Sequence, residues 1–403
     1  MKKLICLLLM IAVTFVLCAC DGKTETKESE KPAMDKPGAT ATEAEITKLE
    51  TAYAELQPHH GQLHDHTNSG RKSDGKATLQ EWLALMPSLD MDFAIIVDHR
   101  QTDHLYHELW DPNLFIGGTE VGSVVIDRPE HSQKYHYNII FPNVTDMEGH
   151  LNKFVLLYKF VNGLTADGYA YISSSQFVEI MDDVLARGGM FVLPHPMQTT
   201  PADDVQKSPL DYYFRDYIYY EVIYDFYSDP AMQKKAYEDN YWLYTGLLAE
   251  GKRVYTSAAC DRHVLPSNRG LSTVYSKEAT GTSYLEQLHV GNVTAGPVGV
   301  RMILGDTRMG GTGTFEGQRL VISVGDFHKD FQNTSHTYRV DVHTDSGKVY
   351  SQTVDPTQTT YIALDADASA KFYRVEIHDE QLNPYYTLLA MGNPIWNSAK
   401  YEG

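Results

Sequence analysis

Cysteine is scarce in this chain of 403 residues, and its placement excludes a disulfide-based fold. Of the four cysteines, Cys6, Cys18 and Cys20 lie within the first 20 residues, and only Cys260 lies in the remainder. A single cysteine cannot form an intrachain disulfide. The fold must therefore depend on hydrophobic cores, and the length suffices for two or three domains.

Positive charge is also in short supply. The chain carries 34 Lys and Arg against 53 Asp and Glu, which gives a net charge of −19 at pH 7. A surface of this sign repels nucleic acid and anionic lipid headgroups at long range, so we expect no nucleic-acid partner. A small phosphorylated substrate stays open, because bound divalent cations can reverse the field locally.

The hydrophobic run at residues 4–17 is short for a membrane-spanning helix. It follows Lys2 and Lys3 and ends in the tetrapeptide Leu-Cys-Ala-Cys at 17–20, which resembles a bacterial lipobox. We predict that residues 1–20 are a lipoprotein signal peptide and that Cys20 carries the lipid. The mature protein would then be exported to the cell envelope and anchored to a bacterial membrane. An ordinary signal peptide or an uncleaved anchor is the alternative.

Three further regions follow the signal peptide. Residues 21–45 hold almost no large apolar side chain, which predicts a flexible linker. In residues 46–297 strand-like and helix-like segments alternate, which predicts a parallel α/β domain, with a barrel as an architecture suited to the length. Residues 298–403 hold short, partly alternating apolar runs separated by turn residues, which predicts a small antiparallel β-sandwich.

The elements are predicted from hydrophobic periodicity. Short continuous apolar runs indicate buried strands, which in the α/β part lie at 93–97, 114–116, 137–141, 190–193, 218–223 and 254–256. Apolar residues at i, i+3, i+4 and i+7 predict helices at 79–86 and 177–185, and a third helix is predicted at 229–251 after an Asp-Pro start. The strands predicted for the C-terminal part lie at 320–324, 337–342, 349–354, 360–364 and 372–377.

Metal-ligating residue types follow several of these strands. His64 and His66 are one residue apart, so on a strand both imidazoles point to the same face. Functional side chains of α/β barrels gather where strands end, and imidazoles and carboxylates are zinc-type ligands. Each such residue alone could be an ordinary polar or helix-capping residue, but their joint occurrence predicts a metal centre. The residues are His64, His66, Asp98, His99, Glu120, His195, Asp261 and His263.

Residues 58–300 resemble the PHP (polymerase and histidinol phosphatase) superfamily. The matching motifs are Leu-His-Asp-His-Thr at 63–67, Val-Asp-His at 97–99, Gly-Thr-Glu at 118–120, Leu-Pro-His-Pro at 193–196 and Cys-Asp-Arg-His at 260–263. Gly-Asn-Val-Thr-Ala-Gly-Pro at 291–297, followed by a β-rich part, is similar to the carbaryl-hydrolase-like branch of these metallohydrolases. The resemblance implies a distorted, TIM-like (β/α)7 barrel that holds two or three divalent metal ions.

The resemblance also implies three groups of ligands. They are His64, His66, Glu120 and Asp261 for a first ion, Glu120, His136 and His195 for a second, and His99, His263 and Asp74 for a third. Residues 68–72 separate Asp74 from the His-Thr motif, where family members often place Ser-Asp-Gly sooner. His131 is the alternative to His136.

Four other histidines have simpler interpretations. His104 and His107 have helical spacing and are expected on an exposed helix face, with metal binding as the alternative. His59 and His60 are expected in a loop.

The chemistry expected of such a centre is hydrolysis. Clustered divalent cations such as Zn, Mn or Fe acidify a bound water and stabilise an oxyanion or phosphorane. No Gly-x-Ser-x-Gly nucleophile motif is present, so attack by metal-bound hydroxide is the simplest mechanism. Because imidazole binds metal only when neutral, activity should fall below about pH 6.

Five residues receive roles in this mechanism. We assign Glu120, Asp261 and Asp98 to catalysis, the last as a ligand or as an orienter of ligands. Arg100 and Arg262 flank ligand positions and are assigned to binding an anionic substrate, with ion pairing to acidic neighbours as the alternative.

The predicted function is a metal-dependent hydrolase of a small-molecule ester, with a phosphoester as the first choice. A carboxylic or carbamate ester hydrolase of the same fold and a non-catalytic surface lipoprotein that binds glycan or protein are the alternatives. The aromatic run between Tyr212 and Trp242 either packs against the barrel, which we prefer, or forms a stacking surface for a sugar or an aromatic substrate.

Overall fold

The computed structural model describes nine stretches of the chain: residues 39–70, 73–127, 134–155, 163–166, 168–197, 208–224, 226–265, 270–382 and 387–401. The predicted signal peptide, Cys20, most of the predicted linker and His131 lie outside these stretches. Within them, no helix combines the length and the apolar character needed to cross a membrane.

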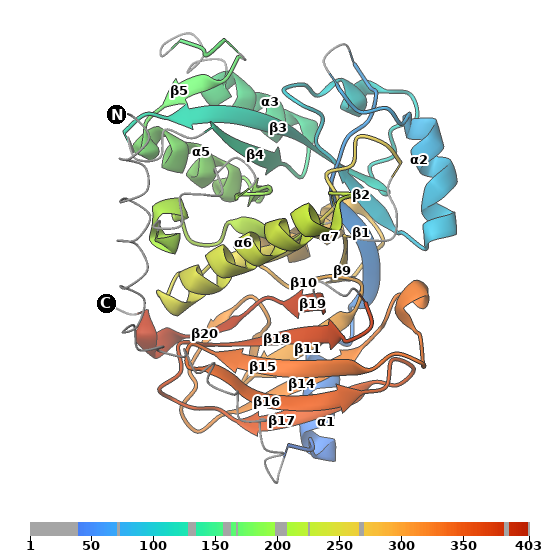
Figure 1. Ribbon diagram of the computed structural model, residues 1–403, viewed down its shortest axis with the longest axis vertical. Coiled ribbons are helices and arrows are strands. Elements are labelled where there is room, and N and C mark those ends of the chain that lie inside the picture. The colour runs from blue at the N-terminus through green and yellow to red at the C-terminus, as the bar shows by residue number, and fades with distance from the viewer. Residues whose placement is uncertain are drawn as a thin grey trace, which may run out of the picture. The chain divides into compact units, whose positions relative to one another are not determined.

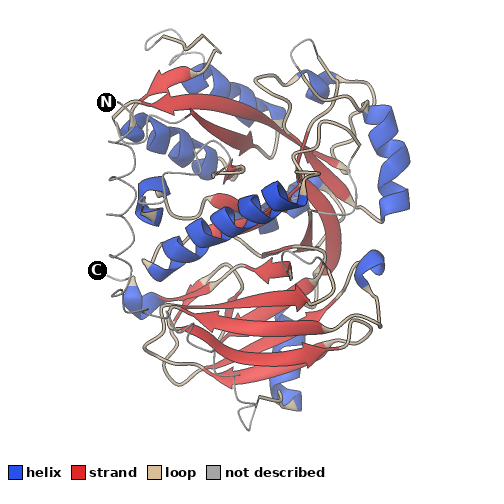
Figure 2. Cartoon of the chain, viewed as in Figure 1, coloured by secondary structure: helices blue, strands red, loops and turns tan. Residues whose placement is uncertain are grey.

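A 16-stranded mixed sheet organises the chain (Figures 1 and 2). Its α/β half has the order β9-β1-β2-β3-β4-β6-β7-β8, with β5 (Ala170–Ile172) beside the far end of β3. These strands are β1 (Gln57–Asp65), β2 (Phe93–Ile96), β3 (Phe115–Val125), β4 (Lys134–Ile140), β6 (Met190–Leu193), β7 (Tyr219–Tyr224), β8 (Tyr255–Ala259) and β9 (Leu271–Ser276).

The sheet is neither fully parallel nor closed. Strand β4 runs antiparallel to both β3 and β6, and β9 runs antiparallel to β1, so the prediction of a parallel domain is wrong in part. Only residues 126–133 separate β3 from β4, fewer than a crossover helix requires, and the chain returns as a hairpin.

The predicted barrel is not confirmed, because β8 ends the strand order with no ladder to β1 in the described residues. Two contacts nevertheless join the strand ends there: a bridge between Asp65 and Arg262, and a hydrogen bond from the Asp261 N–H to the His64 carbonyl (3.1 Å). The α/β class itself is correct.

The three predicted helices are present, and each begins at a side-chain cap. They are α2 (Leu79–Leu85), α5 (Ser174–Ala186) and α6 (Pro230–Ala249), capped by Thr78, Ser173 and Asp229. The helices that the periodicity did not indicate are α1 (Glu43–Ala52), α3 (Val144–His150), α7 (Gly281–His289) and the short turns η1 (Met86–Leu89), η2 (Asp103–Tyr106), η4 (Leu151–Val155), η5 (Pro209–Tyr212), η6 (Lys329–Phe331) and η7 (Ser398–Lys400).

The β-rich C-terminal part has two layers, in which the strands pair antiparallel except for β13, which runs parallel to β20. One is a separate sheet of β12 (Thr307–Arg308), β11 (Gly299–Leu304), β14 (Arg319–Gly325) and β17 (Thr360–Asp365). The other belongs to the large sheet and comprises β10 (Val293–Ala295), β13 (Thr312–Gly313), β15 (Tyr338–Thr344), β16 (Gly347–Val354), β18 (Phe372–Asp379), β19 (Leu388–Gly392) and β20 (Ile395–Asn397). Buried residues of both layers, such as Ile322 and Val375, form one hydrophobic core.

The two predicted domains share a sheet, because β19 pairs with β10 and β10 pairs with β9. The division predicted between 297 and 298 therefore falls between strands that are joined through the sheet, and it stays a prediction. Helix α1 adds a further contact, since Leu49 and Tyr53 pack against Ile303 and Val321 of the separate sheet. This helix begins inside the segment predicted as a linker.

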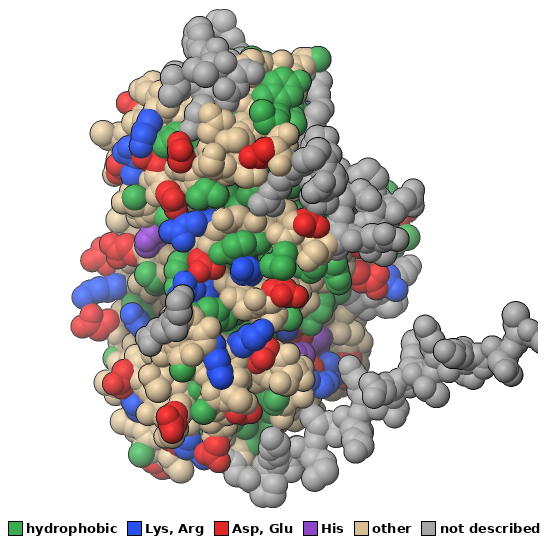
Figure 3. Space-filling model, turned by 90° about the vertical axis from the view of Figure 1, so that its left-hand side faces the viewer, with side chains coloured by type: hydrophobic (Ala, Val, Ile, Leu, Met, Phe, Trp, Pro, Cys, Tyr) green, Lys and Arg blue, Asp and Glu red, His purple; other side chains and the backbone are tan. Residues whose placement is uncertain are grey.

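Charged side chains of both signs are interspersed on the molecular face in Figure 3, which shows Lys and Arg among Asp and Glu. On this face the excess of acidic residues is not gathered into one continuous field.

Candidate metal centre

Among the described residues, three clusters of metal-ligating side chains form on strands β1, β3 and β4 and on the segments that follow β1, β2, β6 and β8. In each, the ligand atoms lie within 4.8 Å of one another. The first cluster is His64, His66, Glu120 and Asp261, the second is Glu120, His136 and His195, and the third is Asp74, His99 and His263, with His66 beside it. The nine predicted ligands are thus brought together in the predicted groups.

The backbone is strained at two of these positions. Asp261 has φ of +49° and His195 has φ of +33°, in a region that residues other than glycine rarely adopt. Such conformations cost about 1–3 kcal/mol each and occur where surrounding contacts hold a functional side chain in place.

The first cluster has the spacing of a tetrahedral metal site. Its Nε2 atoms of His64 and His66 are 3.2 Å apart, and each lies 3.1–3.4 Å from Glu120 Oε2 and from Asp261 Oδ1. Ligands placed 2.0–2.2 Å from a zinc-type ion at tetrahedral angles are separated by about 3.4 Å. The donor set therefore fits one such ion in both chemistry and geometry.

The electrostatics of the first cluster also favour a cation. Burial alone would lower the pKa of His64, but Glu221, Asp261 and Glu120 raise it well above its usual value. Burial likewise opposes protonation of His66, whose pKa is raised to about 9 by Asp261 and Glu120. At most one N–H can lie between the two Nε2 atoms, which are 3.2 Å apart, whereas a cation between them would accept the lone pairs of both rings.

Glu120 connects the first cluster to the second. Its Oε2 faces the first cluster, whereas its Oε1 lies 2.6 Å from His136 Nδ1 and 3.5 Å from His195 Nε2. Burial would raise the pKa of Glu120, but His64, His136 and His195 hold it well below its usual value. An ionised carboxylate with one oxygen in each cluster has the arrangement of a bridging ligand.

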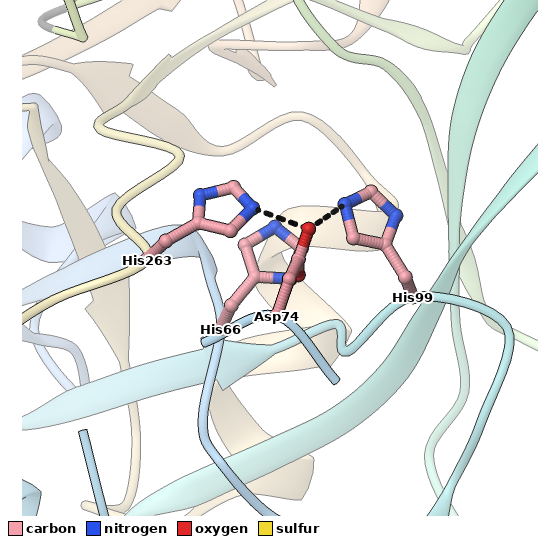
Figure 4. Close-up of side chains that lie close together, drawn as sticks. All are labelled: His66, Asp74, His99 and His263. Carbon is pink, nitrogen blue, oxygen red and sulfur yellow. Dashed lines mark ion pairs between the residues drawn. The ribbon is translucent and has the colours of Figure 1, made fainter. Parts of the chain in front are cut away.

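The third cluster, drawn in Figure 4, is more exposed than the first. Asp74 Oδ2 lies 3.5 Å from His99 Nε2 and 3.3 Å from His263 Nε2, and the His66 ring lies beside them. The loop that carries Asp74 is held by a hydrogen bond from the Lys76 N–H to the His263 carbonyl (2.6 Å). The residues inserted at 68–72 thus do not prevent Asp74 from reaching the cluster.

Asp98 lies outside all three clusters and orients their neighbours. It accepts hydrogen bonds from the Thr67 N–H (2.6 Å) and hydroxyl (2.8 Å) and from Ser73 (3.1 Å), and its Oδ2 lies 3.0 Å from His104 Nδ1. Burial would raise the pKa of Asp98, but His104 and Thr67 lower it. This geometry suits the orienting role and not direct catalysis. His104, predicted to be exposed, is buried, whereas His107 is exposed as expected.

Glu221 was not assigned a role from the sequence. It is buried on β7, where its Oε1 lies 2.8 Å from His64 Nδ1 and its Oε2 accepts the His195 N–H (2.9 Å). A carboxylate on the outer nitrogen of a ligating histidine fixes its orientation and raises its basicity. The signal that the sequence offers is an acidic residue within the predicted strand at 218–223.

The two arginines predicted to bind substrate lie close to the clusters. The Arg100 guanidinium lies over the Tyr169 ring, 5.7 Å from its centroid, and the Arg262 carbonyl accepts the His66 N–H (3.2 Å). Substrate binding by either arginine stays a prediction.

His59 and His60 belong to β1, so their assignment to a loop is wrong. In the aromatic run, Tyr212, Tyr219 and Tyr220 are buried and Trp242 is exposed, which agrees with packing for these three tyrosines.

Comparison with known proteins leaves the family undecided. No protein-family model matches the chain, and no curated protein matches it. A solved structure from Bifidobacterium adolescentis, described as a candidate metal-dependent phosphoesterase, aligns with 14% identity and a TM-score of 0.32 over 52% of this chain and 90% of that chain. A likeness of this size carries no argument. PHP membership therefore stays a prediction, and the site must be interpreted from its own geometry.

Proposed function

We propose that this chain is a metal-dependent hydrolase of the PHP type that acts on small-molecule phosphoesters. The observation that carries the proposal is the first cluster, whose four ligand atoms have tetrahedral spacing and share Glu120 with a second cluster. Paired ions a few ångströms apart are typical of enzymes that hydrolyse phosphate esters.

The side chains of this protein would hold and orient the reacting groups. The first and second clusters would bind two ions of Zn, Mn or Fe, and the third cluster would bind another. Bound there, the ions would supply a water of lowered pKa and neutralise charge on the ester oxygens. Glu221 holds the His64 ring and the His195 backbone, and Asp98 holds the loop that follows His66. Arg100 and Arg262 are the proposed contacts for an anionic group.

The proposal is tested by metal analysis combined with turnover of model esters. Purified protein is loaded with Zn or Mn and assayed with bis(p-nitrophenyl) phosphate, p-nitrophenyl phosphate and p-nitrophenyl acetate. We expect hydrolysis of a phosphate ester that His64→Asn abolishes and that His107→Asn, at an exposed histidine, leaves unchanged. Metal binding without turnover of any ester would refute an enzyme, and turnover of the acetate alone would favour a carboxylic ester hydrolase.

Attachment to a membrane is a separate part of the proposal. It rests on the Leu-Cys-Ala-Cys sequence at 17–20, and we propose that Cys20 carries a lipid on the exported protein. The chain should partition with membranes and incorporate labelled fatty acid in a bacterial host, and Cys20→Ser should lose the label. Labelling that persists in Cys20→Ser would overturn this assignment.

A further inference from the structure

Tyr169 is held beside the second cluster by backbone contacts with Thr165 and β3. It directly precedes β5, which pairs with Ser123–Val125 at the far end of β3. The Thr165 N–H donates to the Tyr169 carbonyl (2.9 Å), and the Tyr169 N–H donates to the Thr165 hydroxyl (3.0 Å). Both the N–H and the carbonyl of Tyr169 are therefore hydrogen-bonded to Thr165.

A glycine makes room for the Tyr169 ring. Gly122 lies two residues beyond Glu120 on β3 and pairs with His136 on β4. A Cβ atom at position 122 would lie 1.6 Å from a ring carbon of Tyr169, so no larger residue fits there. The ring consequently stacks beside His136, with the ring planes 21° apart, and the tyrosine hydroxyl lies 2.8 Å from His136 Nε2.

The two ring nitrogens of His136 thus face different groups. Nε2 faces the Tyr169 hydroxyl, whereas Nδ1 faces Glu120 Oε1 at 2.6 Å. A neutral imidazole has one N–H and one lone pair, and a partner on the outer nitrogen determines which nitrogen can bind a metal. With the Nε2–H donated to the phenol oxygen, the lone pair on Nδ1 points into the second cluster.

We propose that Tyr169 is a positioning residue of the metal centre, which holds His136 as an Nδ1 ligand of the second ion. The proposal rests on the function proposed above and adds a residue that no sequence motif indicated. In this proposal the hydroxyl orients the metal ligand His136, and the aromatic ring has a second role.

That second role concerns Arg100. The guanidinium lies 5.7 Å from the Tyr169 ring centroid, and its Nη1 would be 2.9 Å from a Cβ atom on Gly168. The arginine therefore extends across the backbone before Tyr169 and over its ring, in a cation–π arrangement. One tyrosine connects a ligand of the second ion to the arginine proposed to bind the substrate.

The test separates the hydroxyl from the ring. Tyr169→Phe removes only the hydroxyl, Tyr169→Leu removes both, and Tyr171→Phe, two residues along the same segment, is the matched control. Metal binding is measured with Zn or Mn alone, by calorimetric titration and by metal content after dialysis. We expect Tyr169→Phe to lower the affinity for one of the ions by about 10- to 100-fold and to leave the affinity for the others unchanged. Its KM for a phosphate ester should stay within about twofold of wild type, whereas Tyr169→Leu should also raise KM.

A double mutant cycle completes the test. His136→Gln should weaken the same ion, and adding Tyr169→Phe to it should cause no further loss if the two residues act through one ligand. Thermal unfolding confirms that each variant is folded. Wild-type affinity for every ion in Tyr169→Phe, or additive losses in the double mutant, would overturn the proposal. Absence of metal binding by the wild-type chain would instead overturn the proposed function, and this inference with it.

Discussion

The first and third clusters both combine histidines with carboxylates but differ in exposure. Side chains of the first cluster are at most 8% exposed, whereas Asp74 is 53% exposed and His263 is 28% exposed. The two also differ in proton affinity, because burial lowers the pKa of His99 while neighbouring carboxylates raise that of His66 to about 9.

This difference indicates which ion the protein is built to retain. Buried ligands that already lie at tetrahedral distances lose little conformational freedom when an ion binds. An exposed carboxylate such as Asp74 must be ordered at the moment of binding, and water competes with it. The first cluster should therefore bind its ion more tightly than the third, and substitutions should expose this ranking.

The largest effect is expected from the bridging carboxylate. Glu120→Gln removes the charge shared by the first and second clusters and should weaken the binding of both ions. The loss of activity should exceed the ~100-fold typical of removing an outer partner of a ligand. Metal content after dialysis and the rate on a phosphate ester are measured together, and retention of all ions with full activity would break the assignment of Glu120 as a bridge.

The next largest effect directly tests the ranking. His66→Asn should release the tightly held ion, whereas His263→Asn should release only the most weakly held ion and reduce activity less. Competition titrations with a coloured chelator give the affinity of each ion. Equal losses in the two variants would show that exposure does not set the order of affinity.

An intermediate effect is expected at Glu221, which contacts the first cluster without belonging to it. Glu221→Gln keeps the shape of the side chain but removes the charge 2.8 Å from His64 Nδ1. The affinity of the first ion should fall by about 10- to 100-fold, and that of the third should not change. Equal weakening of both ions would instead point to a general loss of structure.

The smallest effect is expected at His60, which lies on β1 with His64 but is not a predicted metal ligand. Burial lowers the pKa of His60 to about 4, with His328 adding to the effect, so its ring is neutral in the folded chain at neutral pH. Since the unfolded ring titrates near 6.5, folding is favoured above that pH and loses stability as the pH falls from 6.5 towards 4.

For this partly exposed ring the loss should be about 1–2 kcal/mol, measured as the free energy of unfolding of the metal-loaded chain at successive pH values. His60→Gln should flatten that part of the profile. A profile identical to wild type would show that His60 does not titrate differently in the folded chain.

Residues that follow a predicted strand were the most predictable part of the site. Glu120, Asp261 and the pair His64 and His66 could be assigned because ends of neighbouring strands meet at one edge of a sheet. His136 could be assigned only through family resemblance, since it lies on β4, whose antiparallel direction is set by the hairpin and not by its apolar pattern.

Contacts between distant segments could not be predicted from local patterns. Glu221 and Tyr169 contact histidines that lie 157 and 33 residues away in the sequence. The same holds for strand pairing: no periodicity indicates that β10 pairs with β19, or that β8 forms no ladder with β1 in the described part of the chain. Local sequence patterns predicted the helices and strands well, but they did not predict which strands pair in the sheet.

The pairing of β10 with β19 has a practical consequence for work on the α/β half alone. A chain cut at residue 297 would keep β9 and β10 but lose β19, which leaves a row of unsatisfied backbone groups along β10. Such an edge invites pairing with another chain, so the shortened protein should aggregate even with every metal ligand present. The C-terminal residues would then be needed for the solubility of the α/β half.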